Sequence, residues 1–196
     1  MATVRPAHRP SRREELLDAA LDELMSDGQY DVAISRIAKR AGMTSAAVYY
    51  HFDSREELLD ALRERIGRSL LDVVTAQRDE AAMEDWVDGV INRAAEWIRR
   101  SPKEARFLFV ANRLSHGADD EPEVSPFEPV VKVMAEEVLR RDPELGRLGG
   151  TMRAMALLAL LAELAAKGLE GPEGPSASFG TDVHAAHVVG RRILLS

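Results

Sequence analysis

Aromatic and imidazole side chains cluster in IAKRAGMTSAAVYYHF, residues 37–52, although Phe, Trp and Tyr make up only 5% of the chain. Tyr49, Tyr50 and His51 are consecutive, and helical geometry turns successive side chains too far for all three to face one core. Any one tyrosine alone is more simply interpreted as a packing residue. A phenol can also donate to a phosphate oxygen or pack on a thymine methyl group without carrying charge. The cluster therefore indicates a small, stiff contact surface.

Two short helices are needed to position this cluster. One is expected from about Ile34 to Gly42, a glycine suited to the left-handed conformation that ends many helices. Thr44 can cap the next helix, which carries the aromatic residues to about His51. Two short helices joined through Gly and capped by Thr predict a helix-turn-helix. Its inward-facing residues are expected to be Ile37, Ala38, Ala41, Met43 and Val48, with Phe52 closing the small core.

Other helix starts are marked by a Ser followed three residues later by a Glu, the capping-box pattern. It occurs at Ser11–Glu14, Ser54–Glu57, Ser101–Glu104 and Ser125–Glu128, and the last two place Pro102 and Pro126 at the first helical position. A first helix is expected to stop before Gly28 and a long one to run from Ser54 to about Glu80. Further helices are expected at about 83–100, 102–115, 126–141, 151–169 and 181–195. No stretch alternates with period two for long enough to suggest a sheet, so the predicted fold class is all-α.

Residues 37–58, IAKRAGMTSAAVYYHFDSREEL, resemble the DNA-binding domain of the TetR family of transcriptional regulators, whose usual form is IA..AG.S...LYYHF.SKEEL. The resemblance covers roughly residues 11–65. It implies an N-terminal three-helix helix-turn-helix domain joined by a long helix to an α-helical ligand-binding and dimerisation domain. The corresponding boundaries are a flexible basic arm at 1–10, the DNA-binding domain at 11–56 and the effector-binding and dimerisation domain at 57–196.

The resemblance also implies which side chains contact DNA. Those at the start of the recognition helix face the major groove, and the later ones contact phosphates or bases. Arg55 takes the position of the family's phosphate-binding lysine, at a helix N-terminus whose free N–H groups favour an anion. Ala33 replaces the common capping Thr, so the second helix starts less firmly, and Ala46 replaces the common Gly. The implied contact residues are Ser35, Arg36, Thr44, Ser45, Ala46, Tyr49, Tyr50, His51 and Arg55.

Charge is distributed unevenly along the chain. The formal net charge of −7 argues against indiscriminate binding to nucleic acid. Residues 1–13, in contrast, contain four arginines and no acidic residue. Such a basic arm can enter the minor groove or follow phosphates, and it can equally be a solvated tail.

Several classes of protein are not supported by the sequence. Without cysteine there is no disulfide framework, thiolate metal site or cysteine nucleophile. The N-terminal stretch has no apolar segment of the secretory type, and the apolar run Ala154–Ala162 is too short to cross a hydrocarbon core of ~30 Å. We therefore expect a cytoplasmic protein without a membrane span.

Catalytic and metal-binding motifs are equally weak. The chain lacks a Gly-rich phosphate loop, an HExxH and a Gly-x-Ser-x-Gly motif, so no enzyme and no cofactor are expected. His184 and His187 have the helical i,i+3 spacing that could bind a metal. Surface or interface positions fit these histidines better, because no acidic residue completes the pattern. No metal site is expected.

Bulky apolar residues of the second half most simply form a core. A sharper hypothesis is that some of them line a cavity between helices for a mainly apolar small molecule, with Asn112 and Arg113 as polar groups. The candidate ligand-binding residues are Trp86, Trp97, Phe107, Phe109, Asn112, Arg113, Met134 and Met155.

Two C-terminal segments have the composition of interface helices. MRAMALLALLAELAAKGL is apolar on nearly every side between Ala154 and Ala162, and a helix of that kind needs cover all round. DVHAAHVVGRRILL offers small residues beside apolar ones. A homodimer through these C-terminal helices would also match the two-fold symmetry of a palindromic DNA operator, as the resemblance implies.

The sequence therefore predicts a homodimeric, ligand-responsive transcriptional regulator, most simply a repressor, that binds a double-stranded DNA operator and is released by a small, mainly hydrophobic effector. Two alternatives stay open. One is a DNA-binding regulator controlled by a protein partner, which a core without a cavity would favour. The other is a helical interaction protein without DNA binding, which a neutral or acidic surface around Tyr49 and Arg55 would favour.

Overall fold

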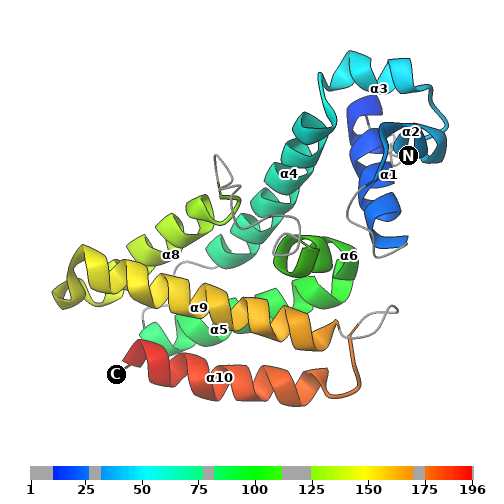
Figure 1. Cartoon of the computed structure of the whole chain (residues 1–196). Coiled ribbons are helices and arrows are strands. Elements are labelled where there is room, and N and C mark those ends of the chain that lie inside the picture. The colour runs from blue at the N-terminus through cyan, green and yellow to red at the C-terminus, as the bar shows by residue number, and fades with distance from the viewer. Residues whose placement is uncertain (1–10, 27–31, 77–81, 112–124, 170–174, 196) are drawn as a thin grey trace, which may run out of the picture. The chain divides into compact units, whose positions relative to one another are not determined.

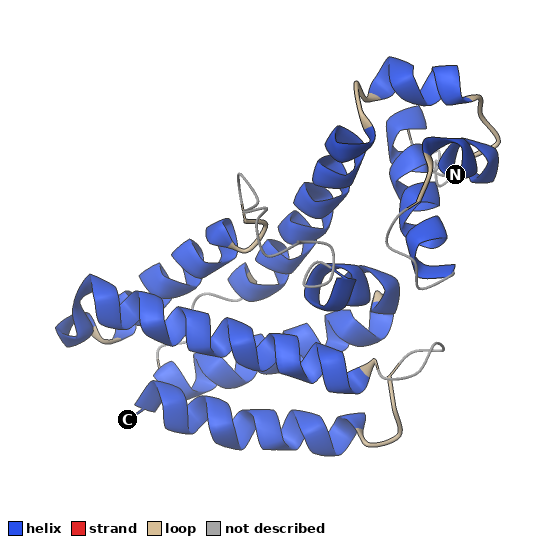
Figure 2. Ribbon diagram, in the orientation of Figure 1, coloured by secondary structure: helices blue, strands red, loops and turns tan. Residues whose placement is uncertain are grey.

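The structure is a computed structural model that describes residues 11–26, 32–76, 82–111, 125–169 and 175–195. Every regular element in these residues is helical (Figure 2), so the predicted all-α class is confirmed. Contacts divide the chain after Leu62 into two units, which we call unit 1 and unit 2. Helix α4 (Arg55–Thr75) begins in unit 1 and continues in unit 2. The predicted basic arm at 1–10 lies outside the described residues.

Unit 1 is a small helical bundle. It contains α1 (Arg12–Ser26), α2 (Ile34–Arg40), α3 (Ser45–His51) and the first turns of α4. Helix α2 packs on both α1 and α3. Ile37, Ala38, Val48 and Phe52 are buried as predicted, whereas Ala41 and Met43 are only half-buried. The capping patterns at Ser11 and Ser54 are confirmed, because each hydroxyl accepts from the N–H of the Glu three residues later.

Unit 2 is built around one apolar helix, α9 (Figure 1). Helix α9 packs against α8 on one side and against α5 and α10 on others. Trp86, Ile91, Ile98, Leu157 and Leu161 are buried in this core. Besides the remainder of α4, the unit contains α5 (Met83–Arg100), α6 (Pro102–Arg106), the π-helix η1 (Phe107–Ala111), α8 (Glu128–Arg141), the 3₁₀ turn η2 (Pro143–Leu145), α9 (Gly146–Gly168) and α10 (Phe179–Leu195).

Helix α9 starts earlier than the predicted residue 151. Gly149 and Gly150 lie inside the first turns of the helix. A Cβ on Gly150 would lie 2.7 Å from the Cγ of Leu139, so this glycine permits close contact with α8. Gly150 therefore reflects packing between two helices and not chain termination.

Three other predicted boundaries were wrong. Helix α4 ends at Thr75, not near Glu80, and the Thr75 hydroxyl donates to the carbonyl of Asp72 in this last turn. Helix α8 starts at Glu128, because the Ser125 hydroxyl accepts from the N–H of Phe127 and leaves Pro126 outside the helix. The helix that begins at Pro102 does not continue as a regular α-helix, since it passes into η1 at Phe107. Ser101 also makes no capping hydrogen bond through its side chain.

The apolar composition of α9 extends beyond the run Ala154–Ala162. Within the described residues, Pro143–Gly168 is the one helical segment long and apolar enough to cross a membrane, with a mean hydropathy of 1.4 over 18 residues. The length of the run Ala154–Ala162 alone therefore underestimated the apolar segment. The packing of α9 against α5, α8 and α10 accounts for the same composition, because each of these neighbours covers part of its apolar surface.

The end of α9 provides a test of this packing. A Cβ on Gly168 would lie 2.4 Å from an edge carbon of the Phe179 ring, whereas a Cβ on Gly180 in α10 would meet nothing within 4 Å. Gly168→Ala should lower the free energy of unfolding by about 1–3 kcal/mol through overpacking. Gly180→Ala should be neutral or stabilising by up to about 1 kcal/mol, because alanine is the better helix former. Urea unfolding followed by circular dichroism measures both, and equal effects would contradict the contact.

Candidate nucleic-acid interface and ligand cavity

The turn between α2 and α3 is fixed by backbone hydrogen bonds. Gly42 has a φ of 66°, in the left-handed region, and its N–H donates to the carbonyl of Lys39. The N–H of Met43 donates to the carbonyl of Ala38 at 2.8 Å, which completes a Schellman motif. The Thr44 hydroxyl then accepts from the N–H of Ala47 at 3.2 Å, as predicted for the cap of α3. The predicted helix-turn-helix is confirmed.

The aromatic cluster divides between core and surface. Val48 is buried beneath α3, and Phe52 lies in the core with the guanidinium of Arg13 4.8 Å from its ring centroid. Tyr49 and Tyr50 are exposed, and Tyr50 retains 86% of its accessible surface. The ring of His51 packs edge-on against that of Tyr50, with 5.2 Å between their centroids. Tyr50 is therefore presented to solvent, and its loss would leave the core unchanged.

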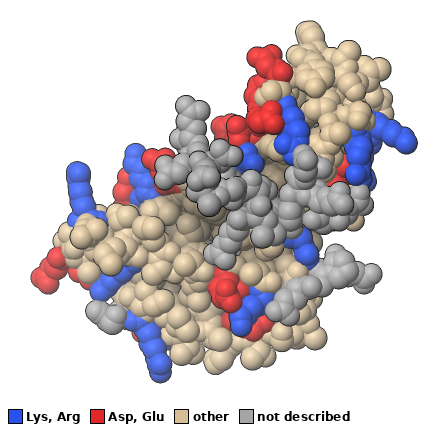
Figure 3. All heavy atoms as spheres, in the orientation of Figure 1, with Lys and Arg blue, Asp and Glu red and all other residues tan. Residues whose placement is uncertain are grey.

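The other predicted DNA-contacting residues of α2, the turn and α3 are mostly at the surface. Thr44, Ala46 and Ser35 are exposed, and Ser45 is half-buried. As predicted, Ala33 precedes α2 without a side-chain hydrogen bond to cap it. The uncharged composition of α3 is visible as a surface without acidic or basic side chains at that end of unit 1 (Figure 3).

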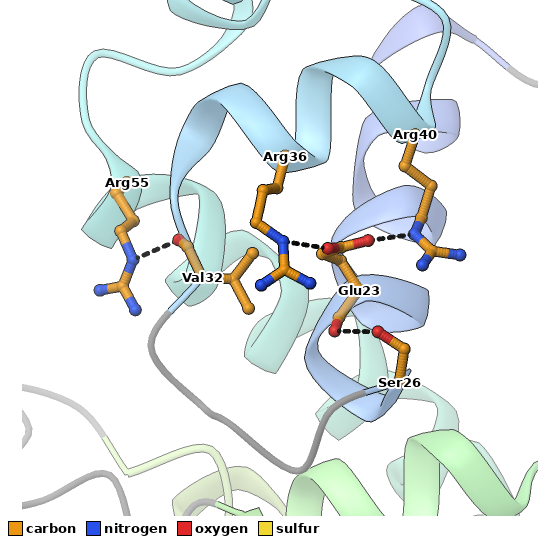
Figure 4. Close-up of polar contacts among 6 residues, drawn as sticks. All are labelled: Glu23, Ser26, Val32, Arg36, Arg40 and Arg55. Atoms are coloured by element: carbon orange, nitrogen blue, oxygen red, sulfur yellow. Dashed lines mark hydrogen bonds and ion pairs between the residues drawn. The ribbon is translucent and has the colours of Figure 1, made fainter.

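A buried carboxylate joins α1 to α2. Glu23 is only 6% exposed, and its carboxylate oxygens accept from the Nε atoms of Arg36, at 2.5 Å, and Arg40. Figure 4 shows the Glu23 side chain reaching between these two arginines, which are spaced one turn apart on α2. Hydrogen bonds from Arg40 and then Arg36 lower the pKa of the Glu23 carboxyl below its ordinary value, against the opposing effect of burial. The predicted DNA-contacting residue Arg36 thus also has a role inside unit 1.

Arg55 is likewise bound within unit 1. Its Nε donates to the carbonyl of Val32 at 2.9 Å, so it ties the start of α4 to the residues before α2 (Figure 4). A further ion pair joins Arg55 to Glu56. Arg55 therefore has a structural role inside unit 1 besides its predicted phosphate contact.

Glu23 and Arg40 were missed in the sequence, although a signal was present. Glu23 lies seven residues after Leu16, on the apolar stripe of α1 where a carboxylate is unexpected. Arg36 and Arg40 have the i,i+4 spacing that places both on one face of α2. Together these features would have indicated a buried acid with two cationic partners.

Unit 2 contains a cavity of about 1020 Å³ that is open to solvent. Most of its lining comes from α8 and α9. Phe109 and Phe127 also line it, and their rings stack with 5.5 Å between centroids. Most of the remaining lining is aliphatic, including Val131, Leu139 and Leu158. The charged lining residues Glu128, Lys132, Glu136 and Arg147 are all exposed. The interior is therefore apolar, and charge is restricted to its solvent edge.

The predicted ligand-binding residues are only partly brought together. Phe109 and Met155 line the cavity, and Trp97 packs edge-on behind Phe109 with a centroid distance of 6.4 Å. Phe127 and the α8 side chains were missed, because only the tertiary pairing of α8 with α9 reveals them. Trp86, Phe107 and Met134 are buried without lining this cavity, and Asn112 and Arg113 lie outside the described residues.

The predicted histidine pair is part of a polar cluster on α5 and α10. The Nδ1 of His187 lies 2.8 Å from Asp88 Oδ1, and its Nε2 lies 3.0 Å from Asn92 Oδ1. Hydrogen bonds from Arg191 and His187 lower the pKa of the Asp88 carboxyl. Among the described residues, no group of three His, Cys, Asp or Glu side chains is arranged to hold a metal ion.

Comparison with known proteins places unit 1 in a family. Residues 16–62 match the description "Bacterial regulatory proteins, tetR family". The transcriptional regulator SrpR of Pseudomonas putida is 37% identical over 62 residues, which are 32% of this chain and 29% of SrpR. BetI of Klebsiella pneumoniae is 37% identical over 65 residues, 33% of each chain. Unit 1 therefore contains the N-terminal domain of the TetR family.

The similarity to these relatives is confined to part of their length. The nucleoid occlusion factor SlmA of Actinobacillus pleuropneumoniae is 30% identical over 99 residues, 50% of this chain and 49% of SlmA. The chain therefore matches at most about half the length of the relatives named here. Unit 2 has to be interpreted from its own residues.

Solved structures extend the likeness in fold to nearly the whole chain. The fatty acid degradation regulator FadR of Bacillus halodurans has a TM-score of 0.73 at 16% identity and covers 97% of both chains. FadR of Bacillus subtilis, solved in complex with stearoyl-CoA, has a TM-score of 0.71 at 13% identity over 90% of this chain and 98% of that chain. These neighbours confirm the predicted fold, with an N-terminal helix-turn-helix and a helical C-terminal part.

The cluster of Glu23, Arg36 and Arg40 predicts that the stability of the fold depends on pH. The folded pKa of Glu23 lies below its ordinary value of 4.5, so the ionised carboxylate stabilises the fold above that pH and stops doing so as the pH falls through the folded pKa. Glu23→Gln should therefore lower the melting temperature most at neutral pH. The difference in melting temperature between Glu23→Gln and the parent should disappear at acidic pH. Thermal unfolding between neutral and acidic pH tests this, with the more exposed Glu15→Gln as control, and a gap independent of pH would contradict it.

Proposed function

We propose that this TetR-family protein is a ligand-responsive transcriptional regulator, most simply a repressor, that binds a palindromic double-stranded DNA operator as a homodimer. A small, mainly apolar effector releases it. The observation that carries the proposal is the apolar cavity of about 1020 Å³ in unit 2, alongside a helix-turn-helix in unit 1. A cavity of this size is in the range that binds small molecules and cofactors.

The DNA-binding part of the proposal is supported by the geometry of α3. The turn at Gly42 and the cap at Thr44 fix the helix, and Tyr49 and Tyr50 project from it into solvent. Exposed tyrosines next to a short capped helix suit a major groove, because phenols can donate to phosphates and their rings can pack on thymine methyl groups.

One observation favours a second candidate, a helical interaction protein without DNA binding. Residues 45–51 carry no Lys, Arg, Asp or Glu, and the acidic Asp53, Glu56 and Glu57 follow closely. Attraction to phosphate would then depend on flanking groups such as Lys39 and the arginines of the N-terminal stretch. Selection of bound fragments from a pool of random DNA separates the candidates: enrichment of a two-fold symmetric sequence supports the regulator, and the absence of any enrichment contradicts it.

The effector part of the proposal rests on the composition of the cavity. Its charged lining residues are exposed and of both signs, so the interior favours an apolar molecule over an ion. The B. subtilis FadR structure contains stearoyl-CoA, a molecule with a long apolar chain. Molecules with a long apolar chain are therefore the first effectors to test for this protein, because the lining of its cavity is mainly aliphatic and aromatic.

The dimer part of the proposal rests on exposed apolar side chains. Leu148, Met152 and Met155 on α9 are 75%, 62% and 56% exposed, and Val188 and Val189 on α10 are each 42% exposed. Figure 3 shows a largely uncharged surface over the middle of α9. Exposed apolar side chains on neighbouring helices are typical of a protein interface and support a homodimer through the C-terminal helices.

DNA binding should depend on the exposed ring of Tyr50. Tyr50→Ala should weaken binding to a duplex selected with the parent protein by about ten-fold, the equivalent of one hydrogen bond, without lowering stability. Tyr50→Phe separates the hydroxyl from the ring, and Lys103→Ala, on the surface of α6, is the control. Fluorescence anisotropy measures each dissociation constant, and unchanged binding by Tyr50→Ala would exclude this side chain from the interface.

Effector binding should be visible at Trp97 and not at Trp86. The chain has two tryptophans, and only Trp97 contacts a ring that lines the cavity. Stearoyl-CoA or stearate should therefore change the emission of Trp86→Phe, which retains Trp97, and leave that of Trp97→Phe unchanged. The same compounds should release the parent protein from selected DNA. Equal responses of the two variants would mean that the ligand binds elsewhere.

A further inference from the structure

Glu23 places a charge among the apolar residues that pack α1 against α2. Its carboxylate is only 6% exposed, and it accepts from the Nε of Arg36 through one oxygen and from the Nε of Arg40 through the other. The two arginines stand one turn apart on α2, and both are exposed (Figure 4). Every other buried residue of α1 and α2 is apolar. The packing of these two helices therefore has one buried polar point, and it is held by two directional bonds.

Hydrogen bonds from successive turns of α2 define how this helix lies on α1. Apolar contacts are non-directional, so α2 could slide or rotate on α1 and still bury much of its apolar surface. A shift by one residue, about 1.5 Å along the axis with a rotation of ~100°, would take at least one arginine away from Glu23. A buried carboxylate that loses a cationic partner is costly, so such alternative arrangements are disfavoured.

Helix α3 takes its orientation largely from α2. Within its seven residues only Val48 is buried, so α3 has little core contact of its own. The hydrogen bond from the Met43 N–H to the Ala38 carbonyl, at 2.8 Å, joins the start of α3 to the end of α2. A rotation of α2 would therefore carry α3 with it and displace the exposed ring of Tyr50.

We propose that Glu23 is a positioning residue for DNA recognition. Held between Arg36 and Arg40, its carboxylate sets the rotation of α2 on α1 and thereby the presentation of α3 to the major groove. This inference rests on the proposed DNA binding of unit 1. It goes beyond that function because it assigns sequence specificity to a side chain that is buried inside unit 1 and makes no contact with DNA.

Positioning and charge affect DNA binding in opposite directions. The charge of Glu23 partly neutralises two arginines, so by itself it opposes the approach of phosphates. Removal of the carboxylate should therefore tighten sequence-independent binding or leave it unchanged. Loss of positioning should weaken specific binding, because base contacts depend on where α3 lies. The ratio of specific to non-specific affinity therefore reports positioning.

Three substitutions isolate the effect. Glu23→Leu removes both hydrogen bonds, and it should fold because buried ion pairs can often be replaced by apolar residues and the two released arginines are already exposed. Glu23→Gln keeps the shape of the side chain, but its NH₂ group cannot accept a hydrogen bond, so only one arginine can be held. Glu137→Leu is the matched control. Glu137 is also buried and bound by two arginines, Arg140 and Arg141, but it lies on α8 in unit 2.

The experiment compares two DNA duplexes with the full chain. One is selected from random DNA with the parent protein, and the other is a shuffled duplex of the same length and composition. Fluorescence anisotropy at one salt concentration gives both dissociation constants, and their ratio is the specificity. Circular dichroism establishes that each variant is folded at the temperature used. A repeated selection with Glu23→Leu shows whether the base preference itself has changed.

Glu23→Leu should lower the specificity by at least about ten-fold, the equivalent of one lost base contact. Its binding to the selected duplex should weaken, whereas its binding to the shuffled duplex should be unchanged or tighter. Glu23→Gln should lower the specificity by a smaller factor, and the repeated selection should give a relaxed or altered sequence. Glu137→Leu should behave as the parent.

Parent-like specificity in folded Glu23→Leu would overturn this inference and leave DNA binding standing. If Glu23→Leu does not fold, the same specificity in Glu23→Gln decides against the inference. An equal loss of specificity in Glu137→Leu would also overturn it, because the effect would then follow from the stability of the whole chain. A parent protein that selects no duplex would overturn the inference together with the proposed regulator.

Discussion

Helix α9 is apolar on nearly every side, and the need to cover it organises unit 2. Three close approaches meet this need through glycine. Leu139 of α8 packs on Gly150, and the ring of Phe179 packs on Gly168. Gly190 of α10 lies close to Leu160 of α9 as well as to Ile91 of α5. Each contact would be obstructed by a Cβ atom, so the glycines set the spacing between helices. What these neighbours leave uncovered is the stripe around Met155 and the adjoining cavity. In unit 2, the surfaces to which we assign function therefore lie along the part of α9 that its neighbouring helices do not cover.

Unit 1 depends on a different constraint, the buried charge of Glu23. A carboxylate on the apolar stripe of α1 is tolerated only with cationic partners, and Arg36 and Arg40 supply them from α2. The cluster therefore fixes α2 against α1, and the Schellman turn at Gly42 fixes α3 against α2. The exposed rings of Tyr49 and Tyr50 are held on a rigid support. Because α3 itself is uncharged, it would supply shape and hydrogen bonding to DNA, and flanking residues would supply the electrostatic attraction.

The helix boundaries of this chain could be predicted well where hydrogen bonds between near neighbours determine them. Thr44 and Gly42 determine the helix-turn-helix through hydrogen bonds between near neighbours, and these were read correctly from the sequence. The start of α9 was missed because Gly149 and Gly150 resemble a break unless the contact with Leu139 is known. The cavity was anticipated in part, through Phe109 and Met155. Phe127 and the lining from α8 were not found, since they depend on which helices pair across a long stretch of chain.

A continuous set of contacts runs from the cavity to the helix that both units share. Phe109 lines the cavity and packs on Trp97, whose indole N–H donates to the Ser69 hydroxyl on α4 at 3.0 Å. Arg93 also joins α5 to α4 through the carbonyl of Val73. The first turn of α4 carries Arg55, which is bound to Val32 in unit 1.

Under the proposed function, a ligand acts by preferring one of two positions of this set of contacts. Inverting a population from 99:1 to 1:99 requires a preference of about 10⁴-fold, or ~5.5 kcal/mol. At about 25 cal/mol per Å², that preference corresponds to roughly 220 Å² of apolar surface buried in one state only. The uncovered edge of the cavity is where the two states can differ by such an area.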